Sequence, residues 1–270
     1  DLAKALNAVH DGFFTQLTKT LHAFCLGTGN IGQTLFKQLN AHSDYLQEHN
    51  GIQVKITGVS NTRKMIFNGD GISLDNWQDE LQANGETADL KEFVARMKGM
   101  NLPNCVFIDN TASPKPVEFY EEVFKSNISV VTCNKIGNSQ AYGQYQAFQS
   151  AARAHGVDFF YETNVGAGLP IIHTLKNLIA SGDRLQKIEA ILSGTISFIF
   201  NNFNGGANFH DVVKMAQEKG YTEPDPRDDL RGTDFMRKML ILARDAGYKM
   251  EAADIQIDNI LPKASLEAAS

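Results

Sequence analysis

The sequence predicts an α/β fold, in which a doubly wound parallel sheet is followed by a smaller α+β part. Over the first 160 residues, short apolar runs typical of strands alternate with longer stretches of helical periodicity. A glycine-rich turn follows the first of these apolar runs. Strands separated by helices are joined by right-handed crossovers, so this order predicts a mainly parallel sheet.

The expected elements follow from these runs in chain order. Residues 1–20 are predicted to form an amphipathic helix, because Leu2, Leu6 and Val9 recur at helical spacing. Residues 66–85 are expected to form an ordered excursion from the sheet. Strands are predicted at 21–26, 54–59, 105–109, 129–133 and 157–161, and helices at 30–42, 86–100, 117–125 and 140–155.

The pattern changes after Tyr161. Pro170 suits the first turn of a helix predicted at 170–181. The segments that follow are predicted as a strand at Leu185–Leu192, a buried apolar segment at Thr195–Phe203, a helix at Phe209–Lys219 and a strand at Ile255–Ile260. Two strands are too few for a complete sheet, so we expect this α+β part to be truncated.

Composition excludes several classes of protein. Apolar residues make up 43% of the chain and charged residues 21%, as in ordinary soluble domains. The net charge of −6, with no basic stripe, argues against a nucleic-acid partner. No apolar run approaches the roughly 18 residues of a membrane span, and the N-terminus does not resemble a secretory signal. Cys25, Cys105 and Cys133 lie in apolar stretches and are expected to be buried free thiols of a cytoplasmic protein.

The glycine-rich turn, Gly27-Thr28-Gly29-Asn30-Ile31-Gly32, lies between a predicted strand and a predicted helix. In a Rossmann-like domain the first glycine permits the tight turn, the second lets the backbone approach a pyrophosphate, and the third lets the helix pack on the strand. The N–H groups that open the helix then face the phosphates. The turn therefore predicts dinucleotide binding, and the alternative is an ordinary tight turn between strand and helix.

The residues after the second strand bear on the choice of cofactor. An acidic residue there would bind the ribose 2′-hydroxyl of NAD. The sequence has Arg63 and Lys64 at this point and no carboxylate. Cations would favour a 2′-phosphate, so NADP is predicted over NAD. The alternative is that both side chains only solvate a loop.

Polar residues also follow the third and fourth predicted strands, at Asp109–Ser113 and Cys133–Lys135. The carboxyl ends of parallel strands border the ligand crevice, so Thr111 and Lys135 are candidates for it, near a nicotinamide. Lys135 could stabilise an alkoxide or exchange a proton, or it could be a surface lysine. Cys133 is interpreted as an inert thiol rather than a nucleophile, because no histidine is near it in the sequence.

Two further segments carry candidate ligands. Glu162 and the carbonyl oxygens of Val165, Ala167 and Leu169 lie in a glycine-rich turn and would suit a hard cation. An ordinary loop before a helix is the alternative.

The second segment is the acidic stretch 220–230, which is followed by Asp234 and Lys238. Its prolines are expected to hold Glu223 and Asp225 in a stiff, non-helical conformation. Such a segment suits a small charged ligand. Alternatively, Asp234 and Lys238 form an i,i+4 pair on a solvated helix face.

Together these motifs resemble the homoserine dehydrogenase family over residues 21–260. The residues that carry the resemblance are those at 27–32, 133–135, 161–170, 193–195 and 220–230, with Asp234 and Lys238. The leading helix and the segment around Trp77 resemble the dehydrogenase half of bifunctional aspartokinase/homoserine dehydrogenases. That resemblance implies a kinase domain in cis on the N-terminal side and a homodimer or higher homo-oligomer.

The family resemblance implies reversible NAD(P)H-dependent reduction of L-aspartate 4-semialdehyde to L-homoserine, in threonine and methionine biosynthesis. It implies catalytic roles for Lys238 as proton donor, Lys135 and Asp234, and substrate binding by Glu223, Asp229, Asp234 and Thr195. It implies cofactor contacts from Gly27, Gly29, Asn30, Ile31, Gly32, Arg63, Thr111, Lys135 and Gly220. The turn of Glu162, Val165, Ala167 and Leu169 would hold a monovalent cation, usually sodium.

We therefore expect three parts: a linker or docking helix at 1–20, a dinucleotide-binding domain at 21–160, and an incomplete substrate-binding and catalytic domain at 161–270. Two other functions stay open. One is another NADP-linked semialdehyde or amino-acid dehydrogenase on the same scaffold. The other is a non-catalytic nucleotide-binding fragment.

Overall fold

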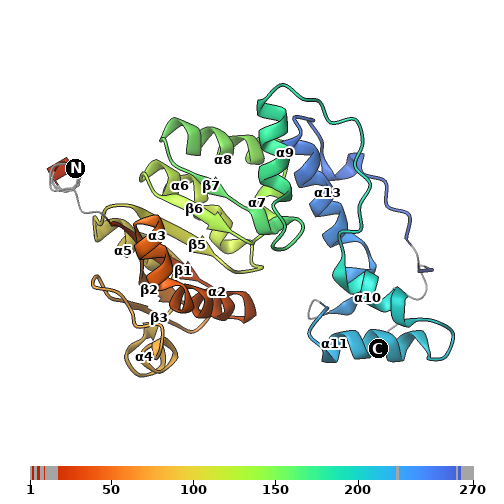
Figure 1. Ribbon diagram of the computed structural model, residues 1–270, viewed down its shortest axis with the longest axis horizontal. Helices are drawn as coiled ribbons and strands as arrows, with labels where there is room; N and C mark the ends of the chain where they lie inside the picture. The colour runs from red at the N-terminus through yellow and green to blue at the C-terminus, as the bar shows by residue number, and fades with distance from the viewer. Residues whose placement is uncertain are drawn as a thin grey trace. The chain divides into compact units, whose positions relative to one another are not determined.

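The structure is a computed structural model that describes Leu2, Ala5, Leu6, Val9 and residues 18–222, 225–259 and 261–262, apart from the side chain of Asp228. The chain divides into two compact units (Figure 1). The first comprises residues 1–137 and 144–161, and the second comprises residues 138–143 and 162–270.

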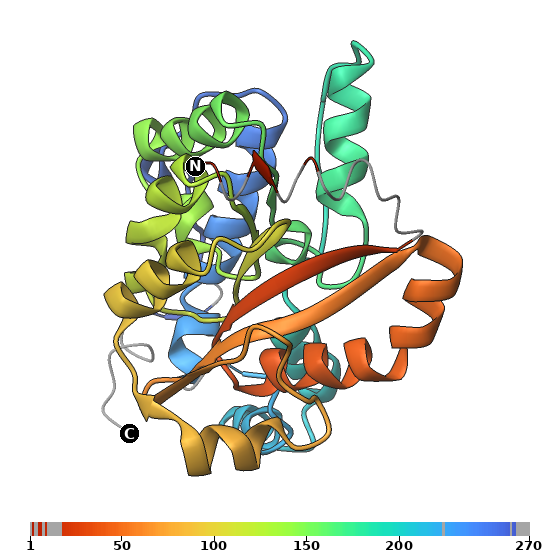
Figure 2. The ribbon, with the colours of Figure 1, turned by 90° about the vertical axis from the view of Figure 1, so that its left-hand side faces the viewer.

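The first unit is built on a seven-stranded sheet in the order β4-β3-β2-β1-β5-β6-β7. Neighbouring strands among β1, β2, β5, β6 and β7 pair in parallel, whereas β3 pairs antiparallel with both β2 and β4. Figure 2 shows β1 and β2 side by side as two long twisted strands. The strands are β1 Lys19–Leu26, β2 Ile52–Ser60, β3 Lys64–Phe67, β4 Glu86–Thr87, β5 Cys105–Asp109, β6 Ser129–Thr132 and β7 Phe159–Phe160. The predicted α/β fold with a mainly parallel sheet is confirmed.

Helices cover both faces of this sheet. Successive side chains of a strand point to opposite faces of the sheet, so the neighbours of two adjacent β1 residues show what covers each face. Cys25 belongs to an apolar cluster with Phe36 and Trp77, whose rings lie 5.0 Å apart. Phe24 points the other way and packs edge-on against Phe93. The helices of this unit are α2 Asn30–Ala41, α3 Ser43–Asn50, α4 Trp77–Asn84, α5 Leu90–Gly99, η1 Lys115–Phe119 and α6 Tyr120–Lys125. Two further helices are shared with the second unit, since α7 Ile136–Ser139 ends there and α8 Tyr142–Ala154 begins there.

The described part of the second unit contains helices and no strand. Its elements are η2 Glu162–Asn164, α9 Ile171–Ala180, α10 Gly194–Asn202, α11 Phe209–Glu218, α12 Pro226–Leu230, α13 Thr233–Asp245 and η3 Ala252–Asp254. A small core of Ile199, Val212 and Ala216 joins α10 to α11.

Two expectations for this unit were wrong. The strands predicted at Leu185–Leu192 and Ile255–Ile260 do not form over 185–192 and 255–259, and Ile260 lies outside the described residues. A strand needs a neighbour to pair its backbone groups, and the described residues of this unit supply none. Asp225 is extended rather than helical, as expected, and Glu223 lies outside the described residues. The acidic segment then forms α12 over Pro226–Leu230, because Asp225 caps this helix through the Arg227 amide and Pro226 fits its first turn.

The segment predicted only as buried and apolar, 195–203, is helix α10. Ser193 caps this helix, since its hydroxyl accepts a hydrogen bond from the Ile196 amide at 3.1 Å. Of the predicted N-terminal helix, Leu2, Ala5, Leu6 and Val9 are helical and exposed, and its other residues up to position 17 lie outside the described part.

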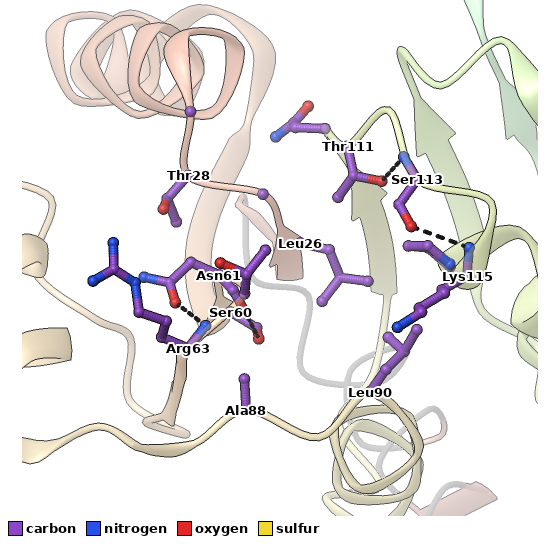
Figure 3. Close-up of a pocket in the computed structure, with 15 residues that line it drawn as sticks. Leu26, Thr28, Ser60, Asn61, Arg63, Ala88, Leu90, Thr111, Ser113 and Lys115 are labelled. Carbon is purple, nitrogen blue, oxygen red and sulfur yellow. Dashed lines mark hydrogen bonds between the residues drawn. The ribbon is translucent and has the colours of Figure 1, made fainter.

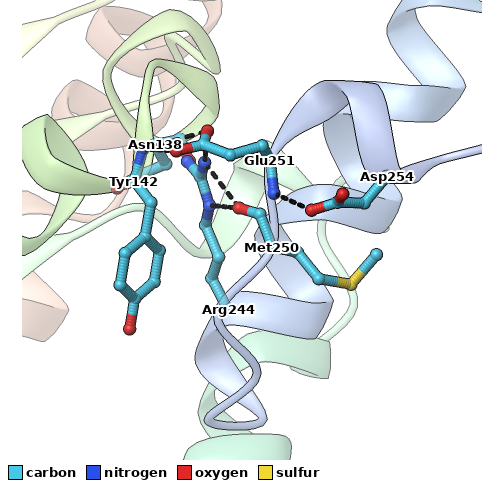
Figure 4. A network of polar contacts seen from close by, with 6 residues as sticks. All are labelled: Asn138, Tyr142, Arg244, Met250, Glu251 and Asp254. Atoms are coloured by element: carbon cyan, nitrogen blue, oxygen red, sulfur yellow. Dashed lines mark hydrogen bonds and ion pairs between the residues drawn. The ribbon is translucent and has the colours of Figure 1, made fainter.

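Arg244, near the end of α13, ties the distant residues 138–142 to the segment that follows α13 (Figure 4). Its buried guanidinium donates to the carbonyl oxygens of Asn138 and Met250, both at 2.9 Å, and to the carboxylate of Glu251 at 3.2 Å. The same carboxylate accepts the Tyr142 amide at 2.9 Å. These bonds explain why residues 138–143, which end α7 and begin α8, belong to the second unit.

Within the described part of the chain, no helix has the length and apolar content that a membrane crossing would require.

Candidate functional site

The three glycines of the turn after β1 meet different surroundings. Gly27 has a left-handed φ of 88°, and a Cβ there would lie 3.0 Å from the carbonyl oxygen of Asn110. A Cβ on Gly32 would lie 2.1 Å from the carbonyl oxygen of Gly27, so the start of α2 packs directly on the turn. A Cβ on Gly29 would meet nothing within 4 Å. The turn therefore leaves open space at its middle glycine.

That open space adjoins the N-terminus of α2, where Gly29 is the N-cap residue. The first N–H groups of a helix have no partner within the helix and lie at the positive end of its dipole. Asn30 and Ile31 stand in this first turn, which contains no acidic residue. Both features suit a phosphate group. The residues present therefore fit the pyrophosphate of a dinucleotide.

A pocket of about 690 Å³ opens at the same end of the sheet (Figure 3). Four of the predicted cofactor residues line it, namely Gly27, Gly29, Arg63 and Thr111. The remaining lining residues are Leu26, Thr28, Ser60, Asn61, Thr62, Ala88, Leu90, Asn110, Ser113, Lys115 and Pro116. Ala88 and Leu90 stand where the chain returns from the 66–85 excursion, so this excursion ends at the pocket.

The cations predicted after β2 separate in the structure. The Asn61 side chain accepts the backbone amides of Arg63 and Lys64, each at 2.7 Å, and so fixes the turn. Arg63 lines the pocket. The ammonium of Lys64 instead donates to the carbonyl oxygen of Gln82 on α4, and Lys64 does not line the pocket. Only Arg63 of this pair is placed to meet a ligand there.

A buried carboxylate, Asp109, organises the ends of β5 and β6. It accepts hydrogen bonds from the Tyr120 hydroxyl at 2.6 Å, the Asn134 amide group at 3.0 Å and the Thr111 backbone at 2.8 Å. Burial first, and then Asp109, raise the pKa of Tyr120 well above its ordinary value. The network brings Thr111 close to Asn134, the residue before Lys135.

The sequence indicates no role for Asp109, Asn134 or Tyr120. Polar residues at the carboxyl ends of two apolar strands were the signal for the first two. Tyr120 gave no local signal, because its contact with Asp109 depends on how η1 and α6 pack beneath the sheet.

None of the three cysteines forms a disulfide bond. Cys25 and Cys105 are buried as expected, whereas Cys133 is half-buried. Burial, with a smaller effect of Asp109 and an opposing one of Lys135, raises the pKa of Cys133 to about 11. A thiol with that pKa is protonated near neutral pH and is a poor nucleophile.

In the second unit, Lys238 and Asp234 form an ion pair on α13, with the ammonium 2.6 Å from the carboxylate. The Lys238 ammonium also donates to the carbonyl oxygen of Leu192 at 2.7 Å. Their side chains are only 16% and 19% exposed. This geometry argues against the alternative of a solvated pair on a helix face, because each charge is largely removed from water.

Asp229 and Asp234 together line a second pocket of about 330 Å³, whose other walls include Ser193 and Phe235. The buried Thr195 donates its hydroxyl to the carbonyl oxygen of Tyr221 and is not among the lining residues. Gly220, with a φ of 71°, follows α11. Glu223, a predicted substrate ligand, lies outside the described residues.

Asp225 has an intramolecular partner. The guanidinium of Arg227 holds its carboxylate at 2.7–3.0 Å through two nitrogens. These hydrogen bonds lower the pKa of Asp225 to about 2. Asp225 therefore acts as a helix cap and ion-pair partner.

The turn predicted to bind a cation follows directly on Tyr161. Glu162 accepts the backbone amides of Ile172 and His173 through its two oxygens, at 2.8 and 2.9 Å. Ala167 has a left-handed φ of 53°, which is uncommon for a residue other than glycine. The described residues contain no group of three or more His, Cys, Asp or Glu side chains able to hold a metal ion. The predicted set differs from such a group, since it has one carboxylate and three backbone carbonyls.

Known proteins resemble the chain over nearly its whole length. A family model described as "Homoserine dehydrogenase, NAD binding domain" matches residues 27–162, and one described as "Homoserine dehydrogenase" matches residues 170–270. The chloroplastic bifunctional aspartokinase/homoserine dehydrogenase 1 of Zea mays is 42% identical over 98% of this chain. A homoserine dehydrogenase from Schizosaccharomyces pombe is 37% identical over 88% of it. The chain spans 29% of the length of the first of these relatives and 65% of the length of the second.

A solved hyperthermophilic archaeal homoserine dehydrogenase in complex with NADPH shares the fold, with a TM-score of 0.71. It is 22% identical, and the match covers 84% of this chain and 70% of that one. The NAD-binding family model alone covers half of the residues, and it spans the glycine turn, Arg63 and the Asp109 network described above. On this match, the chain belongs to the homoserine dehydrogenase family.

Proposed function

We propose that the chain catalyses the reversible NAD(P)H-dependent reduction of L-aspartate 4-semialdehyde to L-homoserine, a step in threonine and methionine biosynthesis. The observation that carries the proposal is that family models of this enzyme match both units. Each unit also contains residues suited to one part of the reaction. The first has the glycine turn and its pocket, and the second has the paired Asp234 and Lys238.

The first unit is assigned to the cofactor, in line with a dinucleotide-binding domain at 21–160. Gly27, Gly29 and the first turn of α2 would hold the pyrophosphate, with further contacts from Thr111, Lys135 and Gly220. When bound, the nicotinamide supplies the hydride. Arg63 lines the pocket after β2, where no carboxylate competes for a ribose hydroxyl, and this supports NADP over NAD.

The second unit is assigned to the substrate, in line with a catalytic domain at 161–270. An ammonium has three N–H donors, and Lys238 uses two of them on Asp234 and Leu192. The third is available to the aldehyde oxygen, to which Lys238 gives its proton. Asp234 then has two roles. It forms the ion pair with Lys238, and together with the neighbouring Asp229 and with Glu223 it binds the substrate ammonium. Lys135 acts on the cofactor side.

Two further roles complete the assignment. Thr195 donates its hydroxyl proton to Tyr221, so its oxygen can still accept a hydrogen bond from the substrate. Glu162 and the carbonyl oxygens of Val165, Ala167 and Leu169 are hard donors that fit a monovalent cation such as sodium. The left-handed φ of Ala167 supports a functional turn, because strained backbone is concentrated at ligand sites.

The function is tested by homoserine-dependent reduction of NADP with the 270-residue chain and with Lys238→Ala. We expect the substitution to lower kcat by about 100-fold or more, the range for loss of a positioned general acid. Lys214→Ala is the matched control, since Lys214 is an exposed lysine of the same unit. Turnover by Lys238→Ala at the rate of the unmodified chain would refute the assignment of Lys238.

A further inference from the structure

The cofactor pocket contains a second cation, Lys115, which the sequence motifs do not indicate. Among its lining residues, Arg63 and Lys115 are the charged ones, and no carboxylate lines it. The chain as a whole carries a net charge of −6. The pocket is therefore lined by positive charge although the protein as a whole is negatively charged, and it suits an anionic ligand.

The two cations come from different walls of the pocket. Figure 3 shows Arg63 beside Asn61 on one side and Lys115 beside Ser113 on the other. Within the described part of the chain, neither side chain has a hydrogen-bond or ion-pair partner for its charged group. Lys64, by contrast, binds the carbonyl oxygen of Gln82. Both pocket cations are thus available to a ligand.

The backbone at Lys115 is fixed by its surroundings. Lys115 lies between Pro114 and Pro116, and proline restricts the chain at both positions. Its amide donates to the Ser113 hydroxyl at 3.3 Å, and the Ser113 amide donates to the Thr111 hydroxyl at 3.3 Å. The Thr111 amide is in turn bound by Asp109. The lysine therefore extends from an ordered turn anchored to the end of β5.

That turn also contacts the glycine turn. A Cβ on Gly27 would lie 3.0 Å from the carbonyl carbon of Asn110 and 3.1 Å from Cγ2 of Thr111. The wall that carries Lys115 therefore adjoins the turn that fits a pyrophosphate. The end of β2 adjoins that turn as well, since the Ser60 carbonyl oxygen accepts the Gly27 amide at 2.9 Å. Arg63 lies three residues farther on, in the turn before β3, at the position that meets the ribose of a dinucleotide.

From this arrangement we propose that Lys115 binds the pyrophosphate of the dinucleotide, while Arg63 binds the 2′-phosphate. The proposal deepens the proposed function and depends on dinucleotide binding at this pocket. Lys115 then contributes to the affinity for NADPH and NADH alike, and Arg63 decides between them.

The test measures the affinity of the 270-residue chain and its variants for four ligands by fluorescence and calorimetric titration. NADPH and NADH both carry the pyrophosphate. ADP-ribose carries the pyrophosphate without a 2′-phosphate, and adenosine 2′-monophosphate carries a 2′-phosphate without the pyrophosphate. Lys115→Ala should lower the affinities for NADPH, NADH and ADP-ribose by the same factor, about tenfold, as expected for a lost hydrogen bond to a charged group. Its affinity for adenosine 2′-monophosphate should not change.

Two variants serve as comparisons. Arg63→Ala should lower the affinities for NADPH and adenosine 2′-monophosphate about tenfold and leave the affinities for NADH and ADP-ribose unchanged. Lys115→Arg keeps the charge and should retain affinities within about threefold of the unmodified chain. Because Lys115 is exposed, thermal unfolding should be the same for all of these proteins, and Lys115→Gln replaces Lys115→Ala if that variant unfolds.

Either of two results overturns the proposal: no change in any affinity on neutralising Lys115, or a change confined to the ligands with a 2′-phosphate. Failure of the unmodified chain to bind either dinucleotide would overturn both this proposal and the proposed function. Binding with the expected pattern but without homoserine oxidation would contradict the proposed function alone.

Discussion

Single residues of the glycine turn show how one residue type meets three separate steric demands. Gly27 needs a left-handed φ, Gly32 allows the helix to touch the turn, and Gly29 has open space around its Cα. The spacing in the sequence predicted these three positions. Which of them faces a ligand follows from the atoms around each one, and those atoms include Asn110, far along the chain.

A matched pair of substitutions separates these roles. Gly29→Ala should leave the fold intact, because its φ of −73° suits alanine and its Cβ has room. The added methyl group would fill the space proposed for the pyrophosphate, so NADPH affinity should fall about tenfold or more. Gly32→Ala should lower the free energy of unfolding by about 1–3 kcal/mol or more, because its Cβ would overlap the Gly27 carbonyl.

Urea unfolding and NADPH titration measure the two effects. If Gly29→Ala binds NADPH as well as the unmodified chain does, the pyrophosphate does not lie at this turn.

At the scale of helices and strands, capping side chains determine where three helices begin, which the local sequence pattern does not show. The first turn of α9 is capped from a distance. The carboxylate of Glu162 accepts the backbone amides of Ile172, ten residues later in the chain, and of His173. Asp225 and Ser193 cap α12 and α10. The sequence predicts α9, but it indicates only a buried apolar segment at α10 and a stiff acidic stretch at α12. The capping bonds that start these two helices cannot be recognised from a local pattern.

Helix α9 and the turn before it carry a prediction about cations. If Glu162 and the carbonyl oxygens of the turn bind sodium, replacing sodium chloride by choline chloride should lower the melting temperature by a few degrees, since a ligand of the folded state stabilises it. The Glu162→Gln variant should lose this sodium-dependent difference. Differential scanning calorimetry at equal ionic strength measures it.

Glu218→Gln, which removes an exposed carboxylate of the same unit, should keep the sodium effect. Equal melting temperatures of the unmodified chain in the two salts would argue against a cation site in this turn.

At the scale of the whole molecule, the chain passes between the two units at 137/138, 143/144 and 161/162. The short segment 138–143 belongs to the second unit because of Arg244, whose side chain is fully buried and bonded to Asn138, Met250 and Glu251. Nothing in the local sequence of 138–143 indicates this. The decisive contacts span more than 100 residues.

Removing this guanidinium should destabilise the second unit. Arg244→Met leaves the carbonyl oxygens of Asn138 and Met250 without their donor, so the free energy of unfolding should fall by about 3 kcal/mol. Arg153→Met, at an exposed position, should change it by less than about 0.5 kcal/mol. Urea unfolding followed by circular dichroism measures both, and equal stability of the two variants would contradict a structural role for Arg244.

By itself the sequence determined the alternation of strands and helices, the dinucleotide turn and the lack of an acidic residue after β2. These are local properties, set by side-chain periodicity and by the backbone freedom of glycine and proline. Only the tertiary structure decided that Lys115 rather than Lys64 shares the pocket with Arg63, that Tyr120 holds Asp109, and that 185–192 and 255–259 have no strand neighbour in the described residues. Each of these depends on sheet register and packing between residues far apart in the chain, which no local pattern encodes.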